Sequence, residues 1–327
     1  MKNNRKTFVL IECVLGILVL ISVLFMMQQQ KEGSKTKIVV MIENSDDSRW
    51  AAFKYGIKMA AEDCKVEAVI AGDDMGQTIA EQKKAIEREI RRGAAAVILE
   101  PPMEEGGEKL LQEIEKEVPV VLVGYGMESQ EEQRAFPLVA PDYSAMGQAL
   151  VHAWKADCGG DLSGKTLGIY LGGKQTTATR QLENSIREAA EADKAVVRWM
   201  VSDDTKDDLT AVEKLLNLQD KVSAVFALDD GSFVAAGQAA GAKDLHNARV
   251  YGIGYSTDAV HVLDQGMASA LIVPNEFDIG YESLTEAAES LKLFSGKQTG
   301  KTVSYTVLRR DTLFLEKNQK ILYAISH

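Results

Sequence analysis

Short apolar runs alternate with amphipathic stretches along most of the chain. The first run, KIVVMIE at 37–43, precedes helical spacing over 49–63, and VEAVIAG precedes a helix over 78–92. Two more runs, AAAVILEPP and VPVVLVG, flank a helix over 104–117. Apolar strands of this length that alternate with helices are typical of a parallel sheet covered on both faces.

The same pattern then restarts in the second half. Strands are expected at KTLGIYLGG, AVVRWMVSDD, VSAVFALDD, ARVYGIGYS and ASALIVPNE, each followed by a helix. Two consecutive α/β units predict two similar lobes, each a doubly wound parallel sheet, joined by a three-segment hinge. We expect one lobe to hold residues 35–139 plus 275–305 and the other to hold 140–274 plus 306–327.

Residues 8–27 form an apolar run, FVLIECVLGILVLISVLFMM, that follows three basic residues. An apolar helix of about 20 residues spans a bilayer core, and the preceding positive charge orients its N-terminus to the cytoplasm. A cleaved signal peptide is the alternative, but such a peptide needs small residues where Met26, Met27 and three glutamines stand. We therefore expect residues 1–34 to form a cytoplasmic tip, a single-pass transmembrane anchor and a linker, with the binding domain extracytoplasmic.

Charge and cysteine content narrow the classes of function. The net charge is −11 with no basic run after the first six residues, which argues against a nucleic-acid partner. Residues 1–34 carry four basic and two acidic groups, so the rest of the chain has a net charge of −13. A domain this acidic should not lie flat on anionic lipid. Cys64 and Cys158 are too few for a disulfide framework, and we do not expect them to pair.

Catalytic and metal-binding patterns are missing from the sequence. The four histidines have no metal-ligand spacing, GIGYST is no dinucleotide fingerprint, and LGGKQTT lacks the spacing of a phosphate-binding loop. No nucleophile motif is present either. We expect a binding protein without cofactor or metal, not an enzyme.

Candidate binding residues follow from one rule, that open parallel sheets bind ligands beyond the carboxyl ends of their strands. In the first lobe that edge receives Asp46, Asp47, Trp50, Glu100 and Tyr125. The first crossing and the second lobe supply Asp142, Arg180, Asp229, Tyr255 and Asn275.

The stretch VFALDDGS at 225–232 places two carboxylates where a strand meets a helix. We expect Asp230 to cap a helix that begins at Gly231, and Asp229 to face the cleft between the lobes. The other candidates have structural alternatives. Trp50 could be core, and Arg180 could pair with Glu183 on the surface.

The remaining candidates are equally open to a structural role. Asp46 and Asp47 could form a turn, and Asp142 could cap a helix. Tyr125 and Tyr255 are chosen by position only.

The order of several motifs resembles the periplasmic binding protein type 1 family. The motifs are VVMIENSDDSRWAAFKYGIKMAAED, GAAAVILEPP, VPVVLV, PDYSAMGQAL, TATR, AVFALDD and GQAAG, and the likeness covers residues 37–310. Within the family, the chain is similar to ribose and simple-sugar binders, whose clamshell is shared by the ligand-binding domains of lactose-repressor-like regulators. The apolar run at 8–27 occupies the place where such a regulator carries its DNA-binding domain.

The resemblance implies a receptor that closes around one small molecule. It implies that Trp50 stacks on a sugar ring behind the polar pair Asp46 and Asp47. It also implies that Arg180 clamps hydroxyl groups and that Asp229 accepts hydrogen bonds from them. Such contacts are physically suited to sugars, which offer apolar faces and hydroxyl donors.

Three positions depart from the sugar binders. Gly124–Tyr125 stands where they carry Asp-Arg, Gly254 ends a motif that normally closes with Asp, and Pro274 takes the place of a Gln. These changes argue against ribose and leave another sugar or a non-sugar metabolite open. We expect delivery to an ABC permease, with a ligand-sensing subunit of a membrane histidine kinase or chemoreceptor as the alternative.

Overall fold

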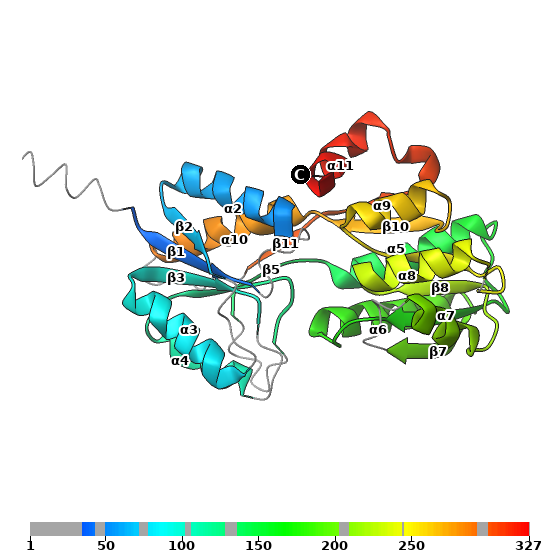
Figure 1. Cartoon of the computed structure of the whole chain (residues 1–327), viewed down its shortest axis with the longest axis horizontal. Helices are drawn as coiled ribbons and strands as arrows, with labels where there is room; N and C mark the ends of the chain where they lie inside the picture. Colours follow the sequence, from blue (N-terminus) through cyan, green and yellow to red (C-terminus); the bar gives the residue numbers. More distant parts are fainter. Residues whose placement is uncertain are drawn as a thin grey trace, which may run out of the picture.

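The structure is a computed structural model that describes residues 35–42, 50–71, 78–101, 106–127, 136–202, 209–243, 245–292 and 300–326. In these residues the chain forms two α/β lobes that lie side by side (Figure 1). Each lobe is built on a six-stranded sheet, so the prediction of an α/β fold with two parallel-sheet lobes is confirmed. No described helix has both the length and the apolar character of a membrane span, and the predicted anchor at 8–27 lies outside the described residues.

The first sheet has the strand order β11-β5-β4-β3-β1-β2, with every pair parallel. Its strands are β1 (Lys37–Met41), β2 (Glu67–Ile70), β3 (Ala94–Leu99), β4 (Val120–Val123), β5 (Leu138–Pro141) and β11 (Lys301–Val303). Helices α2 (Ala51–Cys64) and α10 (Glu276–Ser290) cover one face, and α3 (Ile79–Arg91) and α4 (Gly107–Glu115) cover the other (Figure 1).

The second sheet has the order β12-β10-β9-β8-β6-β7. Its strands are β6 (Thr166–Leu171), β7 (Val196–Ser202), β8 (Ala224–Ala227), β9 (Arg249–Ile253), β10 (Ala270–Pro274) and β12 (Tyr305–Leu308). Helices α5 (Tyr143–Asp157) and α6 (Thr177–Ala192) cover one face; α7 (Leu209–Asn217), α8 (Asp230–Gly241) and α9 (Thr257–Asp264) cover the other. Unlike the other pairs, β12 runs antiparallel to β10, because it returns directly from the first lobe through Ser304.

The C-terminal segment follows β12 along the second lobe. It consists of η2 (Arg310–Thr312), η3 (Glu316–Asn318) and α11 (Gln319–Ser326). Leu313 is fully buried in the second lobe's core, and α11 also contacts α2 of the first lobe (Figure 1).

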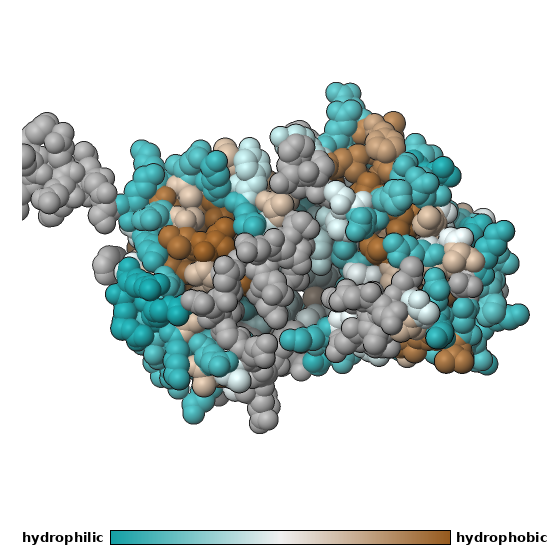
Figure 2. Space-filling view, in the orientation of Figure 1, coloured by the Kyte–Doolittle hydropathy of each residue, from teal (hydrophilic) through white to brown (hydrophobic). Residues whose placement is uncertain are grey.

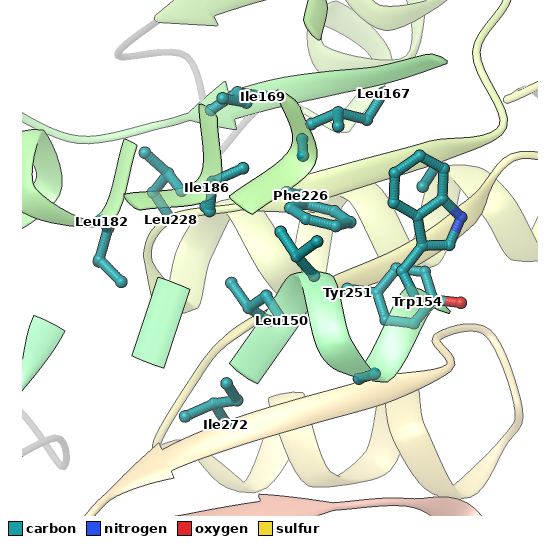
Figure 3. Packing of buried hydrophobic residues seen from close by; sticks show 14 of the residues in the cluster. Leu150, Trp154, Leu167, Ile169, Leu182, Ile186, Phe226, Leu228, Tyr251 and Ile272 are labelled. Carbon is teal, nitrogen blue, oxygen red and sulfur yellow. The ribbon is translucent and has the colours of Figure 1, made fainter. Parts of the chain in front are cut away.

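Aromatic rings fill the α5–α6 side of the second sheet. The Phe226 ring receives Trp154 edge-on at 5.7 Å and Tyr251 at 5.5 Å, as Figure 3 shows. Edge-to-face pairs of this kind add to the stabilisation that burial alone provides. The sheet that carries the second half of the site therefore rests on a rigid support.

Two glycines let α2 and α10 approach closely in the first lobe. A Cβ at Gly56 would collide with the Phe277 carbonyl, and a Cβ at Gly280 would collide with the Phe53 carbonyl. The two backbones therefore touch at a distance that only glycine permits. Trp50, which directly precedes α2, belongs to the same buried cluster as Ile279 of α10.

Candidate functional site

A cavity of about 170 Å³ lies between the lobes and is lined from both. The first lobe contributes residues that follow strands β3 and β4 and the start of α10, among them Glu100, Tyr125 and Glu276. The second lobe contributes residues that follow β8 and β9, among them Asp229 and Tyr255. The cavity therefore lies beyond the carboxyl ends of strands in both sheets, where open parallel sheets bind ligands.

The complete described lining combines aromatic, acidic, hydroxyl-bearing and apolar side chains. It consists of Trp50, Glu100, Val123, Gly124, Tyr125, Tyr143, Thr176, Ala178, Thr179, Leu182, Leu228, Asp229, Ile253, Tyr255, Pro274, Glu276 and Ile279.

Trp50 belongs to both the core and the cavity. The residue is 7% exposed, and its ring contacts the Phe53 ring edge-on at 5.2 Å. The same residue also lines the cavity. The ring is thus held rigidly by packing while part of it remains accessible from the cleft.

Asp229 caps α8 and also lines the cavity. Its Oδ1 accepts from the Ser232 amide at 2.9 Å, while its Oδ2 accepts from the Ser232 hydroxyl at 2.6 Å and from the Gly172 amide at 3.0 Å. These donors orient the carboxylate just beyond the carboxyl end of β8, at the cavity. The prediction that Asp230 is the cap is wrong, because α8 begins at Asp230 and the capping residue is the one before it.

Asp230 instead holds the loop between β9 and α9. Its Oδ1 accepts from the amides of Tyr255 at 2.7 Å and Ser256 at 2.9 Å. Burial raises the pKa of the Asp230 carboxyl above its ordinary value, although the two amides act in the opposite direction. The second carboxylate therefore positions Tyr255, whose side chain lines the cavity.

Gly254 makes room for this arrangement. A Cβ at Gly254 would lie 3.0 Å from Asp230 Oδ1 and 2.7 Å from the Ala259 Cβ. A side chain at this position would therefore displace the carboxylate that holds Tyr255.

Two hydroxyl groups of the second lobe bond to the loop after β4 in the first lobe. The Tyr143 hydroxyl donates to the Gly124 carbonyl at 2.5 Å, and the Thr177 hydroxyl donates to the Gly126 carbonyl at 2.7 Å. Burial raises the pKa of Tyr143 far above its ordinary value, so the phenol stays protonated and remains a donor. These bonds hold the lobes together on one side of the cavity.

Tyr125 has its own backbone partner. Its hydroxyl donates to the Pro101 carbonyl at 3.2 Å, within the first lobe. The ring therefore lines the cavity while the hydroxyl is directed to the loop after β3.

Three predicted site residues lie outside the described lining. Asp142 caps α5 by accepting from the Ala145 amide at 2.9 Å, and Asn275 caps α10 by accepting from the Asp278 amide at 3.3 Å. Both stand where the chain crosses between lobes. Arg180 is exposed on α6, and its role in binding stays a prediction.

Asp46 and Asp47 lie outside the described residues, and their role stays a prediction as well.

The sequence did not single out several lining residues. Tyr143 directly follows Asp142, and Glu276 directly follows Asn275. Each is therefore the first helical residue after a predicted site residue, and that position was the signal that could have identified it. Thr176 and Thr179 form a capping box at the start of α6, which a Thr-x-x-Thr pattern can indicate. In the described residues, no group of three or more His, Cys, Asp or Glu could hold a metal ion.

Comparison with known proteins agrees with this geometry. Residues 38–298 match a family model described as periplasmic binding protein domain. No curated protein matches the chain.

Several solved structures share the fold. A carbohydrate transporter solute-binding protein from Agrobacterium radiobacter, in complex with D-arabinose, is 17% identical with a TM-score of 0.74, over 88% of this chain and 99% of that one. GanP, a glucose-galactose binding protein from Geobacillus stearothermophilus, is 17% identical with a TM-score of 0.73, over 86% and 100%. A structure of the XylFII–LytSN complex is 18% identical with a TM-score of 0.69, over 85% and 98%.

Proposed function

Since the chain belongs to the periplasmic binding protein domain family, whose members bind solutes and are not enzymes, we propose that it is a receptor that closes around one small sugar. The observation that carries the proposal is the cavity between the lobes, which both lobes line with aromatic and hydrogen-bonding side chains.

The chemistry of the lining suits a monosaccharide. The rings of Trp50, Tyr125 and Tyr255 offer faces for the apolar side of a sugar ring. The carboxylates of Glu100 and Asp229 can accept from its hydroxyl groups, and such charge-assisted bonds are stronger than neutral ones. A cavity of about 170 Å³ holds one small molecule, not an oligosaccharide.

In this proposal the bound sugar is not ribose. Gly254 and Tyr125 replace polar groups that the sugar binders use, and Asp230 is committed to the Tyr255 loop. Structures of the same fold are described as bound to D-arabinose or to α-D-tagatopyranose. Pentoses other than ribose and ketohexoses are therefore the first candidates.

We further infer that the receptor is anchored in the cell membrane by residues 8–27, with the clamshell outside the cytoplasm. The support is the sequence of that segment and the family to which the clamshell belongs. Delivery of the sugar to an ABC permease is the most direct use of such a receptor, and solute-binding proteins of carbohydrate transporters share its fold.

A second function, ligand sensing, has one specific observation in its favour. The XylFII–LytSN complex shows that a protein of this fold can assemble with another protein. An anchored clamshell could likewise report its closed state to a membrane histidine kinase or chemoreceptor. Membrane proteins that co-purify with the full chain distinguish the two functions: an ATP-powered permease supports transport, and a kinase or chemoreceptor supports sensing.

The experiment that tests the binding function is a thermal shift of the full chain in detergent. The panel contains D-arabinose, D-tagatose, D-glucose, D-galactose, D-ribose, nucleosides and amino acids. A ligand at about 1,000 times its Kd adds about 4 kcal/mol, which is several degrees in a domain of this size. A shift with a sugar supports the proposal, and a shift with only a nucleoside or amino acid overturns the sugar assignment.

A further inference from the structure

We propose that a lysine-rimmed groove at the outer edge of the first lobe binds the surface of an anionic phospholipid membrane. This inference rests on the membrane anchor in the proposed function and not on the identity of the sugar. The groove has a volume of about 200 Å³. Its described lining consists of Lys35, Lys54, Ile57, Lys58, Ala61, Glu62, Val66, Ala68 and Ile70.

One side of the groove is a single stripe of α2. The lining residues of this helix recur at intervals of three and four from Lys54 to Glu62, which places them on one helix face. Lys54 and Lys58 belong to this stripe, and lysine side chains can bury their aliphatic part while they extend the charged end toward a membrane surface.

The other side is the edge strand of the sheet. β2 ends the strand order, so its outer backbone groups face away from β1. Ala68 and Ile70 are only partly buried and belong to the face that α2 covers. Figure 2 shows apolar surface over β2 at this edge of the lobe, with hydrophilic surface above and below it. Exposed edge strands are usually protected or used for an interaction.

Two acidic residues next to the groove, Asp63 and Glu67, point away from it. Glu67 alternates with Ala68 along β2 and so points to the opposite sheet face, where Val69 packs. Asp63 accepts a hydrogen bond from the Tyr281 hydroxyl at 2.9 Å, on the side of α2 that faces α10. Among the described lining residues, the lysines therefore outnumber the single carboxylate, Glu62.

The position of the groove in the chain selects its occupant. Lys35 lines the groove, and only residues 28–34 separate it from the apolar run at 8–27. Seven residues reach at most about 25 Å when fully extended. When the apolar run spans a bilayer, Lys35 therefore stays within about 25 Å of that bilayer's surface, which keeps the groove within reach of it.

Charge and apolar surface together favour anionic lipid over a neutral surface. Each lysine near an anionic membrane is attracted within about a Debye length, and apolar side chains add affinity for the interface. The rest of the extracytoplasmic part is acidic, so this groove orients the first lobe on the membrane and leaves the remainder of the receptor directed away. The cleft then keeps a fixed orientation toward a membrane partner.

The test uses the full chain in lipid nanodiscs of phosphatidylcholine alone or with phosphatidylglycerol. Lysine acetylation is followed by mass spectrometry for Lys54 and Lys58, with Lys109 on α4 and Lys116, the residue directly after α4, as internal references. We expect labelling of the groove lysines to slow by about fivefold in anionic nanodiscs, and 1 M salt to remove the effect. Equal labelling in the two lipids overturns the proposal.

A charge-reversal variant gives a second measurement. In the double variant Lys54→Glu, Lys58→Glu, we expect Lys35 to be labelled equally in both lipids. The matched control Lys109→Glu, Lys116→Glu changes the same charge on the opposite face of the sheet and should keep the protection of Lys35. Protection that persists in the groove variant would contradict the proposal.

Further measurements distinguish a failure of the anchor from a failure of the groove. A chain that does not remain with the nanodisc refutes the anchor and the groove together, whereas a retained chain with unprotected lysines refutes the groove alone. Competition by soluble glycerol phosphate at low concentration would show a headgroup site without membrane docking and would overturn the proposal. Sugar titrations on the same nanodiscs test the binding function independently.

Discussion

The Thr177 hydroxyl donates a hydrogen bond to the Gly126 carbonyl at 2.7 Å and so joins the second lobe to the first. Thr177 is the first residue of α6, and Gly126 lies in the loop after β4. Next to this bond, the Tyr143 hydroxyl reaches the Gly124 carbonyl of the same loop. Separation of the lobes at this side of the cavity must break both bonds, so both stabilise the arrangement of the lobes in the structure.

The variant Thr177→Val should therefore favour opening. Loss of one side-chain hydrogen bond costs about 0.5–1.5 kcal/mol, which shifts the open–closed ratio by about 2–12-fold. Pulsed EPR distances between labels at Lys84 and Glu188 measure the opening. Thr285→Val is the matched control, because that hydroxyl bonds to the Tyr281 carbonyl within α10. Identical distance distributions in Thr177→Val and wild type would show that the bond does not hold the lobes.

Asp229→Asn should weaken sugar binding and also cost some stability, because the amide nitrogen that replaces Oδ2 cannot accept from the Gly172 amide. The amide oxygen can still accept from the Ser232 amide at the α8 cap, but the charge that strengthens a bond to a sugar hydroxyl is gone. We expect affinity to fall by about 10–100-fold, as measured by calorimetry with the sugar identified by thermal shift.

Ser256→Ala is the control for Asp229→Asn. It removes the cap of α9, whose hydroxyl accepts from the Ala259 amide, and should lower stability by about 1 kcal/mol while affinity changes less. Full affinity in Asp229→Asn would place the ligand's hydroxyl groups elsewhere in the cavity.

Asp230 should contribute a distinctive pH dependence to stability. Burial raises the pKa of its carboxyl in the folded state, so the folded protein holds this proton more tightly than the unfolded chain. The contribution of Asp230 to the free energy of unfolding therefore falls as pH rises from the ordinary aspartate pKa through the higher folded pKa. Asp230→Asn removes this dependence while it keeps an acceptor for the Tyr255 and Ser256 amides.

Denaturant unfolding at pH 4 and pH 7 measures the effect. Wild type should gain stability relative to Asp230→Asn on going from pH 7 to pH 4. Asp258→Asn, which removes an exposed charge from the first turn of α9, is the control and should show a smaller change. A constant difference between wild type and Asp230→Asn at both pH values would refute the link.

Gly254→Asp should not convert the site into that of an ordinary sugar binder. The new Cβ would lie 3.0 Å from Asp230 Oδ1 and would bring a second carboxylate next to it. We expect a loss of about 1–3 kcal/mol in stability from overpacking and no gain in ribose affinity. Ribose binding at the strength of the preferred sugar would contradict this account of the departure.

The alternation of apolar runs and helical stretches was enough to predict both lobes, because buried parallel strands and covering helices each leave a strong local pattern. It was not enough to assign the roles of Asp229 and Asp230, because α8 begins one residue earlier than predicted and this shift decides which of the two caps the helix. Helix boundaries respond to tertiary contacts, here the Gly172 amide and the Tyr255 loop, that no local pattern encodes.

Among the residues that line the cavity, the sequence likewise identified those with a local signal and missed those whose position depends on tertiary structure. Trp50, Tyr125, Asp229 and Tyr255 were identified because each closely follows a strand or opens a helix at the ligand-binding edge. Tyr143 and Glu276 were not identified, since their position in the cavity depends on how the crossings orient one lobe against the other. The sequence predicted a strand at YTVLRRDTLF but not its antiparallel direction, because a short connection through Ser304 decides that direction.

The most direct test of a sugar in the cleft is a calorimetric titration of the full chain with D-arabinose, D-tagatose, D-glucose and D-galactose, repeated on Trp50→Leu. Leucine keeps apolar packing against Phe53 but removes the ring that a sugar would stack on. The account predicts one-to-one binding of at least one sugar by wild type and a loss of about tenfold or more in the variant. Sugar binding that Trp50→Leu leaves unchanged, or no binding of any sugar by the folded wild type, would contradict it.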